Sequence, residues 1–283
     1  MAARPSPTER QKRLGSELRR MRTTADISAE SAAGLLGVDR GKISNIEAGA
    51  RPISAERLRT LAHNCGCTDS RYINGLVEMA QPSARGWWER YRGTLPQGLL
   101  DIAELEASAL RMRAAYSMHI PGLLQTSDHA LALFRVVIPQ LPEREIALRL
   151  AHRVERQGIL DGESPPPYAG IVHEAALRMQ FGGRAVARTQ LNHLLAKSEQ
   201  PNVTLLVIPF DAGAFPGAGQ TVLYAEGAVS QLDTVQIDNS HGPLFVHSEE
   251  QLAKYRAHLD WMEGIALPPG RSRDFIHNIA RQL

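Results

Sequence analysis

Apolar residues near the start of the chain recur with the spacing of short helices. Leu14, Leu18 and Met21 are separated by four and three positions, which predicts an amphipathic helix over residues 14–24. Residues that cap helices recur up to position 80, and they predict four further helices that start at about Ser28, Asp39, Ser54 and Asp69. The first part of the chain is therefore expected to form a compact domain of five helices.

The second and third of these helices have the pattern of a helix-turn-helix, in residues 29–48 (AESAAGLLGVDRGKISNIEA). Two short helices that cross at a steep angle need small residues at their contact, and Ala33 is small enough for the next helix to pass close by. Gly37 occupies the turn, where a residue that tolerates positive φ is needed. Ile43 and Ile46 are three positions apart, so both point inward from one side of the third helix.

The outward side of the third helix, from about Asp39 to Ala48, is small, polar or basic, and such a set suits the major groove of DNA. Arginine can read guanine and asparagine can read adenine through paired hydrogen bonds, whereas residues at the edges of the motif position the phosphate backbone. The residues expected to contact DNA are Ser28, Arg40, Gly41, Lys42, Ser44, Asn45 and Arg51. The alternative is that Arg40 and Lys42 belong to an ordinary solvated helix face.

Beyond residue 100 the pattern changes from helices alone to helices alternating with short apolar strands. A helix is expected from Asp101 to a break at residues 119–122, with Leu105, Ala109 and Met112 along one face. Strands are expected at residues 168–172, 203–208, 221–224, 234–237 and 244–246. The predicted fold class is α+β: a five-helix N-terminal domain, followed by C-terminal helices with a small mixed β-sheet.

These patterns divide the chain into four segments. We expect a disordered basic lead-in at residues 1–12, the helix-turn-helix domain at 13–80, a connection at 81–100, and an α+β regulatory or interaction domain at 101–283. The connection contains Trp87 and Trp88, which are expected to anchor it onto the following domain.

Composition and charge agree with a globular DNA-binding protein. The chain has 283 residues, of which 43% are hydrophobic and 22% charged, so it can bury substantial cores. It has no apolar run long enough to span a membrane and no signal-peptide pattern at its start, so we expect a cytoplasmic protein. Residues 1–80 contain 13 Lys+Arg and 9 Asp+Glu, whereas the remainder contains 19 and 21. This basic excess on the helix-turn-helix side favours attraction to phosphates.

Candidate catalytic and metal-binding motifs are incomplete, so an enzyme is not expected. His173-Glu174 begins like a zinc-protease motif, but Leu177 occupies the position of the second histidine ligand. Three glycines between positions 213 and 219 follow a strand without the Gly-Lys-Ser/Thr of a phosphate-binding loop. Cys65 and Cys67 have no second cysteine pair that would complete a zinc site. The sequence therefore predicts no metal and no cofactor.

The stretches LGSELRRMR (residues 14–22) and ISAESAAGLLGVDRGKISNIEAG (residues 27–49) resemble the lambda-repressor and Cro-like (XRE-type) family of helix-turn-helix regulators. The resemblance implies sequence-specific binding of double-stranded DNA, usually by a homodimer. It also implies a structural ion pair between Glu47 and an arginine of the first helix, either Arg19 or Arg22. The family often has Gln at the position of Ala29, so this chain is expected to lack one of the usual DNA contacts.

The rest of the chain resembles a C-terminal domain of unknown function (DUF5753, antitoxin-like of the Scr1 type) found on many actinomycete XRE-type regulators. The matching segments are Leu105-Glu106-Ala107, IPGLLQT (residues 120–126), VERQGIL (residues 154–160), PNVTLLVIPFDAGAFPG (residues 201–217) and the closing helices. Such regulators often have a neighbouring gene for a small partner protein. Tyrosine is common after the LLQT motif, where this chain has His129.

Together these patterns predict a transcriptional regulator whose C-terminal domain dimerises and senses an effector. That effector is either a small molecule or a small partner protein, and both remain open at this point. The region expected to receive it consists of Ile120, Pro121, Gly122, Leu123, Leu124, Gln125, Thr126 and His129. The alternative function is an antitoxin-like member of a two-gene module, which would bind a small partner protein and autoregulate its operon.

Overall fold

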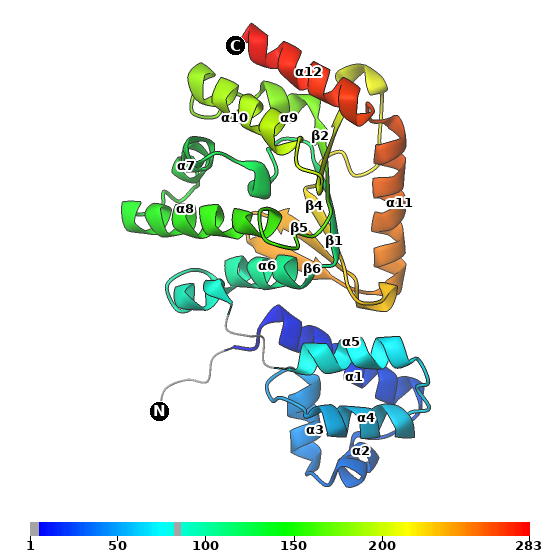
Figure 1. The fold of residues 1–283 in the computed structure, drawn as a ribbon. Helices are drawn as coiled ribbons and strands as arrows, with labels where there is room; N and C mark the ends of the chain where they lie inside the picture. The colour runs from blue at the N-terminus through cyan, green and yellow to red at the C-terminus, as the bar shows by residue number, and fades with distance from the viewer. Residues whose placement is uncertain (1–5, 82–85) are drawn as a thin grey trace. The chain divides into compact units, whose positions relative to one another are not determined.

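The computed structural model describes residues 6–81 and 86–283, and it divides into two units (Figure 1). Unit 1 comprises Met1–Arg90 together with the separate segment Gly227–Asp233, and unit 2 comprises Tyr91–Glu226 and Thr234–Leu283. Unit 1 is helical, whereas unit 2 combines helices with a mixed six-stranded sheet. The predicted α+β fold class is therefore confirmed. Residues 1–5 of the expected lead-in and residues 82–85 of the expected connection lie outside the described residues.

Unit 1 contains the five predicted helices. They are α1 (Glu9–Thr24), α2 (Ala29–Leu36), α3 (Arg40–Glu47), α4 (Ala55–Asn64) and α5 (Ser70–Ala80). The predicted caps are present: Ser28, Asp39 and Ser54 each accept a hydrogen bond from a backbone N–H three residues further on. Gly37 ends α2 with φ 60°, which is the left-handed conformation that was predicted for this turn.

The first helix begins earlier than predicted, at Glu9 instead of Leu14. The Thr8 hydroxyl accepts a hydrogen bond from the Gln11 N–H, and the Gln11 side chain accepts one from the Thr8 N–H. This reciprocal capping box satisfies two backbone donors that would otherwise be unpaired at the start of the helix. Residues 9–12, which the sequence suggested were disordered, are therefore helical.

Helices α1 and α3 approach each other through their backbones. A Cβ atom added to Gly15 in α1 would lie 2.4 Å from the carbonyl oxygen of Glu47, at the end of α3. Gly49, with φ 73°, packs in the same way against Gln11: its Cβ would lie 2.8 Å from the Gln11 carbonyl carbon. Only glycine permits contacts this close, so these two positions set the distance between α1 and α3.

Unit 2 has the larger set of elements. Its strands are β1 (Arg111–Tyr116), β2 (Tyr168–His173), β3 (Val203–Ile208), β4 (Val222–Glu226), β5 (Thr234–Asn239) and β6 (Gly242–Val246). Its α-helices are α6 (Gln97–Ser108), α7 (Ser127–Arg135), α8 (Glu143–Gln157), α9 (Glu174–Arg178), α10 (Arg184–Lys197), α11 (Glu249–Ile265) and α12 (Pro269–Gln282). Its short 3-10 helices are Gly122–Leu124, Gly158–Leu160 and Phe210–Ala212. The 3-10 helix Ser230–Leu232 belongs to unit 1, and the one at Trp87–Tyr91 spans the boundary between the units after Arg90.

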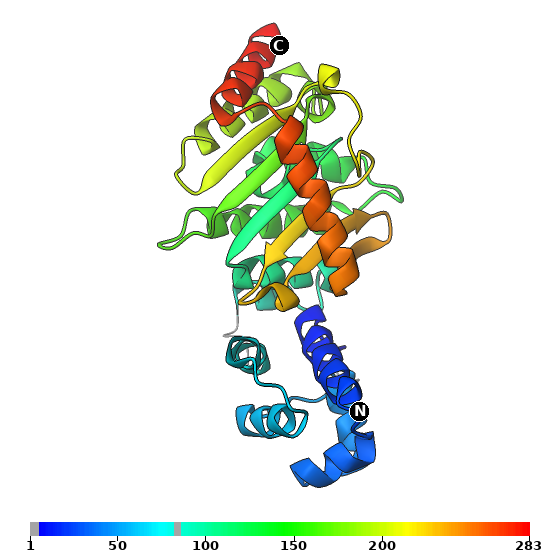
Figure 2. The ribbon, with the colours of Figure 1, turned by 90° about the vertical axis from the view of Figure 1, so that its right-hand side faces the viewer.

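The sheet has the strand order β3-β2-β1-β4-β5-β6. Strands β1, β2 and β3 are parallel, and the pairs β1–β4, β4–β5 and β5–β6 are antiparallel. Helix α11 covers one face of the sheet, where Leu252, Leu259 and Met262 are buried (Figure 2). Helices α9, α10 and α12 pack on the opposite face, around Met112 and Ala114 of β1. Both faces of the central strands are therefore covered, which accounts for their nearly continuous burial.

The central strand β1 was missed by the sequence analysis, which assigned residues 101–118 to one helix. Helix α6 instead ends at Ser108, and the chain then pairs with β2 on one side and β4 on the other. Its sequence, RMRAAY, contains no β-branched residue and has good helix formers, so local preference favoured the wrong element. Pairing on both edges and burial on both faces override that preference.

Two parts of the expected connection at 81–100 are helical. Residues Trp87–Tyr91 form a 3-10 helix, and α6 already begins at Gln97. The rings of Trp87 and Trp88 meet edge to face, with centroids 5.8 Å apart. Within unit 2, the Tyr91 hydroxyl donates to Glu155 of α8 at 3.1 Å, so the aromatic end of this segment is tied to α8. In the described parts of the chain, no helix is long and apolar enough to cross a membrane.

Gly15→Ala is expected to destabilise unit 1 by about 1–3 kcal/mol, because the new methyl group would overlap the Glu47 carbonyl and push α3 away. The matched control is Gly34→Ala in α2, where an added Cβ meets nothing within 4 Å. That change should stabilise the helix by about 0.5–1 kcal/mol. Amide hydrogen exchange of α1, α2 and α3 in the full chain measures both effects. A Gly15→Ala protein with wild-type protection would contradict the proposed contact.

Candidate functional site

Helix α3 has one buried face and one exposed polar face. Ile43 and Ile46 are buried in the core of unit 1. The Asp39 carboxylate at the start of the helix accepts the Lys42 N–H at 2.8 Å, so it caps the helix. Arg40, Gly41, Ser44 and Asn45 are exposed on the outer side, and Lys42 is partly exposed. The backbone geometry therefore presents the predicted DNA-reading residues together on one surface.

The orientation of α3 is held by a nearly buried arginine of α1. Arg22 donates from Nε to Glu47 Oε1 at 2.5 Å and from one terminal nitrogen to Glu47 Oε2 at 3.0 Å, a bidentate pair. Its other terminal nitrogen donates to the carbonyl of Ile27, just before α2, at 2.6 Å. The hydrogen bonds to Glu47 raise the pKa of the Arg22 guanidinium. One side chain thus links α1, the entry to α2 and the end of α3.

Of the two arginines considered for this pair, Arg22 makes it. Arg19 is exposed, and its guanidinium makes no ion pair with any residue that the structure describes. Because Glu47 is engaged by Arg22, its carboxylate does not add an unpaired negative charge to the polar face of α3.

The two flanking residues predicted to position DNA are also exposed. The Ser28 hydroxyl accepts a hydrogen bond from the Ser31 N–H at 3.0 Å and shares a second bond with the Ser31 hydroxyl at 2.8 Å. Arg51 follows the glycine turn after α3, and its N–H donates to the Asn45 carbonyl at 3.2 Å. Both residues belong to segments that are hydrogen-bonded to the motif, at the start of α2 and just beyond α3.

In unit 2, the segment at residues 120–126 is held by amide side chains from neighbouring helices. The Gln157 amide of α8 donates to the carbonyls of Gly122 and Gln125, at 3.1 Å and 2.8 Å. The Gln190 amide of α10 donates to the Leu124 carbonyl at 2.7 Å and accepts from the Thr126 N–H at 2.7 Å. All eight residues predicted to form the effector region are buried, apart from the partly exposed Thr126. The segment therefore joins α8 and α10 to the core of unit 2.

Three of the sequence segments that resemble the C-terminal family meet at one buried ion pair. Glu106 of α6 pairs with Arg156 of α8 at 3.1 Å, and both side chains are buried. The Arg156 guanidinium lies against Gly122, where an added Cβ would be 2.4 Å from its nitrogen. Burial raises the pKa of Glu106 to about 7, and the positive charge of Arg156 opposes that rise. The glycine of the IPGLLQT motif thus makes room for this arginine.

Sequence reasoning did not identify Glu106 or Arg156 as site residues. Arg153, one turn before Arg156, donates to the Gln125 side chain at 2.6 Å and lies over the ring of Phe134. Burial, together with a smaller contribution from the charge of Arg156, lowers the pKa of Arg153 to about 10. Nothing in the local sequence distinguishes these arginines from the exposed charges on α8. Their role follows only from the chain segments that meet them.

His129 differs from its neighbours because it is buried without polar contacts. It is 1% exposed, and neither ring nitrogen has a hydrogen-bond partner within the described part of the chain. Burial lowers its pKa to about 4, with a smaller contribution from the charge of Arg153. His129 therefore stays neutral in the folded protein near pH 7.

The other candidate motifs take structural roles. His173 accepts a hydrogen bond from the Ala175 N–H at 3.2 Å and packs against Phe210 and Phe215, so it caps α9. Cys65 and Cys67 are free thiols, both half-buried. Within residues 6–81 and 86–283, no group of three or more His, Cys, Asp or Glu residues could hold a metal ion.

Replacing His129 by Leu should make the unfolding free energy of unit 2 less sensitive to acid. The unfolded histidine binds a proton below about pH 6.5 but the folded one only below about 4, so the stability contributed by neutral His129 is lost as the pH falls through this window. Between pH 7 and pH 5 the wild type should therefore lose about 2 kcal/mol of unfolding free energy that the variant retains.

Urea denaturation of both proteins at pH 7 and pH 5 measures this difference. At pH 7 the variant should be at least as stable as the wild type, because it removes two unpaired polar atoms from the core. The matched control is His277→Leu on α12, where the side chain is exposed. An equal change in stability at the two pH values for His129→Leu would show that His129 is solvated or paired.

Comparison with known families agrees with this arrangement. A helix-turn-helix domain family matches residues 13–71, which span α1 to the start of α5, and such domains belong to DNA-binding regulators. A family described as a domain of unknown function (DUF5753) matches residues 99–278, nearly all of the C-terminal part. No curated protein and no solved structure matches the chain. The protein thus belongs to the DUF5753 family and joins that domain to an N-terminal helix-turn-helix.

Proposed function

We propose that this protein binds specific sequences of double-stranded DNA by placing α3 in the major groove. The observation that carries the proposal is the exposed polar face of α3, which the nearly buried Arg22–Glu47 pair holds in one orientation. A helix bound rigidly to its domain and exposing arginine and asparagine can align their paired hydrogen-bonding groups with base edges.

Each exposed residue has a role suited to its chemistry. Arg40 and Asn45 are the candidates for reading guanine and adenine, since each has two adjacent hydrogen-bonding groups. Gly41 allows close approach of the helix to the groove, and Ser44 offers a short hydroxyl group. Lys42, Ser28 and Arg51 are suited to phosphate oxygens, which position the domain without reading sequence.

Asn45→Ala is expected to lower DNA affinity by about 5- to 150-fold, which corresponds to the loss of one paired base contact of about 1–3 kcal/mol. Lys42→Ala should lower affinity for all sequences and reduce the salt dependence of binding by about one phosphate contact. The DNA ligand is selected from a random-sequence pool with the wild-type chain, and gel shift measures the affinities.

The matched control for these variants is Asn64→Ala, at an exposed asparagine near the end of α4. It should leave both affinity and stability at their wild-type values. Circular dichroism confirms that each variant is folded. Wild-type affinity in both the Asn45 and the Lys42 variants would rule out α3 as the recognition helix.

We also propose that the protein acts as a homodimer, with unit 2 supplying dimerisation and the sensing of an effector. A single α3 of eight residues reaches few base pairs, whereas two copies on half-sites one helical turn apart provide the specificity of a regulator. Light scattering coupled to size-exclusion chromatography of the full chain should give a mass twice that of the 31.1 kDa chain. A monomer that also binds the selected DNA as one chain per site would contradict dimerisation.

A further inference from the structure

Unit 1 is built from two separate stretches of the chain, and the second is a loop that contains apolar residues. The segment Gly227–Asp233 connects β4 to β5, yet it belongs to unit 1. Leu232 is 8% exposed and lies in the same core as Leu14, Leu18 and Leu76. Val229 packs against that core as well. A connection between antiparallel strands needs only two to five residues, so this longer, partly apolar loop is not simply a turn.

Helix α5 has a site shaped for this loop. Gly75 lies on the side of α5 that faces Leu232, and a Cβ added there would be 2.6 Å from the Leu232 Cδ1 atom and 3.3 Å from the Ala228 Cβ atom. The glycine therefore makes the space that the loop occupies. By contrast, Gly34 in α2 has nothing within 4 Å of its Cβ position, so a helical glycine in this unit need not contact anything.

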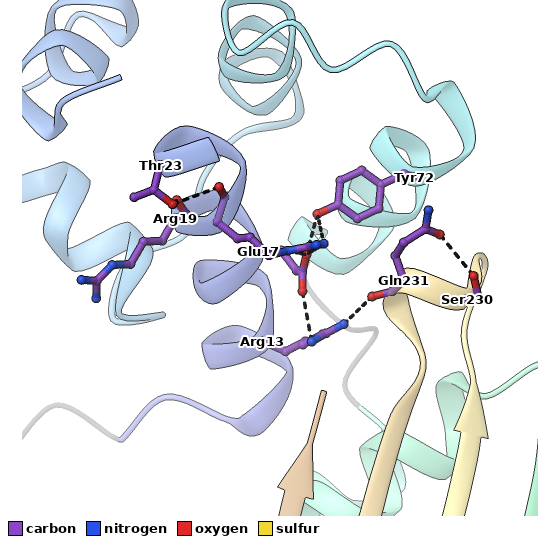
Figure 3. A network of polar contacts seen from close by, with 8 residues as sticks. Arg13, Glu17, Arg19, Thr23, Tyr72, Ser230 and Gln231 are labelled. Carbon is purple, nitrogen blue, oxygen red and sulfur yellow. Dashed lines mark hydrogen bonds and ion pairs between the residues drawn. The ribbon is translucent and has the colours of Figure 1, made fainter. Parts of the chain in front are cut away.

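A buried polar network fastens the loop to α1 (Figure 3). Arg13 of α1, 5% exposed, donates to the carbonyl of Gln231 at 2.5 Å and pairs with Glu17 at 3.0 Å. Glu17 in turn accepts the Tyr72 hydroxyl of α5 at 2.5 Å. Burial lowers the pKa of Arg13, although its charge is stabilised by Glu17. The loop thus completes a network that joins α1 to α5.

The loop is also closed on itself. The Asp233 carboxylate, which is buried, accepts the Gly227 N–H at 2.9 Å, so the two ends of the loop are joined. A Cβ at Gly227 would lie 2.8 Å from the Leu232 carbonyl oxygen, so this closure requires glycine. Because the loop holds its shape, a displacement of either β4 or β5 moves Leu232 and the Gln231 carbonyl together.

We propose that the β4–β5 loop couples unit 2 to DNA binding, by completing the core of the helix-turn-helix unit when it is seated and loosening that core when it is withdrawn. Arg13, which contacts the loop, and Arg22, which holds α3, are both on α1, nine residues apart. Withdrawal of the loop therefore weakens the helix on which the orientation of α3 depends. This inference rests on the proposed DNA-binding function for its consequence, and on the loop contacts for its mechanism.

Coupling of this kind is reciprocal. If withdrawal of the loop destabilises α5, then a change in α5 must also alter the stability of the loop and of the strands β4 and β5. The test uses the full chain and hydrogen exchange measured separately for each element. In Leu232→Ala, exchange in α1 and α5 should rise at least tenfold, and DNA affinity should fall at least fivefold. The milder Leu232→Val should show smaller changes in the same elements while the chain stays folded.

The reverse experiment perturbs the helix and observes the strands. Gly75→Ala places a methyl group against Leu232, so exchange in β4 and β5 of unit 2 should also rise severalfold. The matched control is Gly34→Ala, which should change exchange in neither strand. Ser230→Ala is the control within the loop, because the Ser230 side chain is exposed and its hydroxyl donates a hydrogen bond to the neighbouring Gln231 side chain.

The outcomes separate this inference from the proposed function. If Leu232→Val and Gly75→Ala alter α1 and α5 but leave β4 and β5 at wild-type exchange, the loop only fills the core of unit 1 and the coupling is wrong. If exchange is coupled in both directions but the wild-type chain selects no DNA, the coupling stands and the DNA-binding function fails. Coupled exchange together with wild-type DNA affinity in Leu232→Ala would overturn the regulatory part of the inference.

Discussion

The helix-turn-helix arrangement depends on the hydrogen bonds that the Arg22 guanidinium donates to the segments around it. Because its burial leaves it little water, its donors must be met by protein acceptors, and they are met by Glu47 at the end of α3 and the Ile27 carbonyl before α2. That requirement leaves one relative placement for the three helices. The glycines at positions 15 and 49 then allow α1 to approach α3 closely enough for the pair to form. The polar face of α3 is thus presented by a rigid support.

Unit 2 uses the same physical principle at a different place. Four carbonyl groups of the segment 120–126 accept hydrogen bonds from the amides of Gln157, Gln190 and Gln125, and the buried Glu106 is paired with Arg156. Buried polar groups that are each paired specify one arrangement of the segments that supply them. The IPGLLQT segment, where the sequence predicted an effector region, is buried and forms a packed joint between helices. A regulator can transmit a change through such a joint only if the paired groups move together.

Much of unit 1 was predictable because its signals are local. The caps at Ser28, Asp39 and Ser54, the glycine at position 37 and the inward Ile43 and Ile46 act within one or two turns of helix. The five expected strands of unit 2 were also located, since each is a short apolar run between turn residues. Strand β1 was not, because RMRAAY prefers helix until β2 and β4 pair with it.

What the sequence determined by itself is the helix-turn-helix, its caps and the polar residues on the outside of α3, because spacing along a helix decides which side chains share a face. Tertiary structure alone decided that Arg22 is the partner of Glu47, that Glu106 and Arg156 meet at Gly122, and that Leu232 enters the core of unit 1. Each of these contacts joins residues distant in the chain, so no local pattern distinguishes them from exposed charges or an ordinary loop. Burial is what makes these contacts obligatory, and burial exists only once the chain has folded.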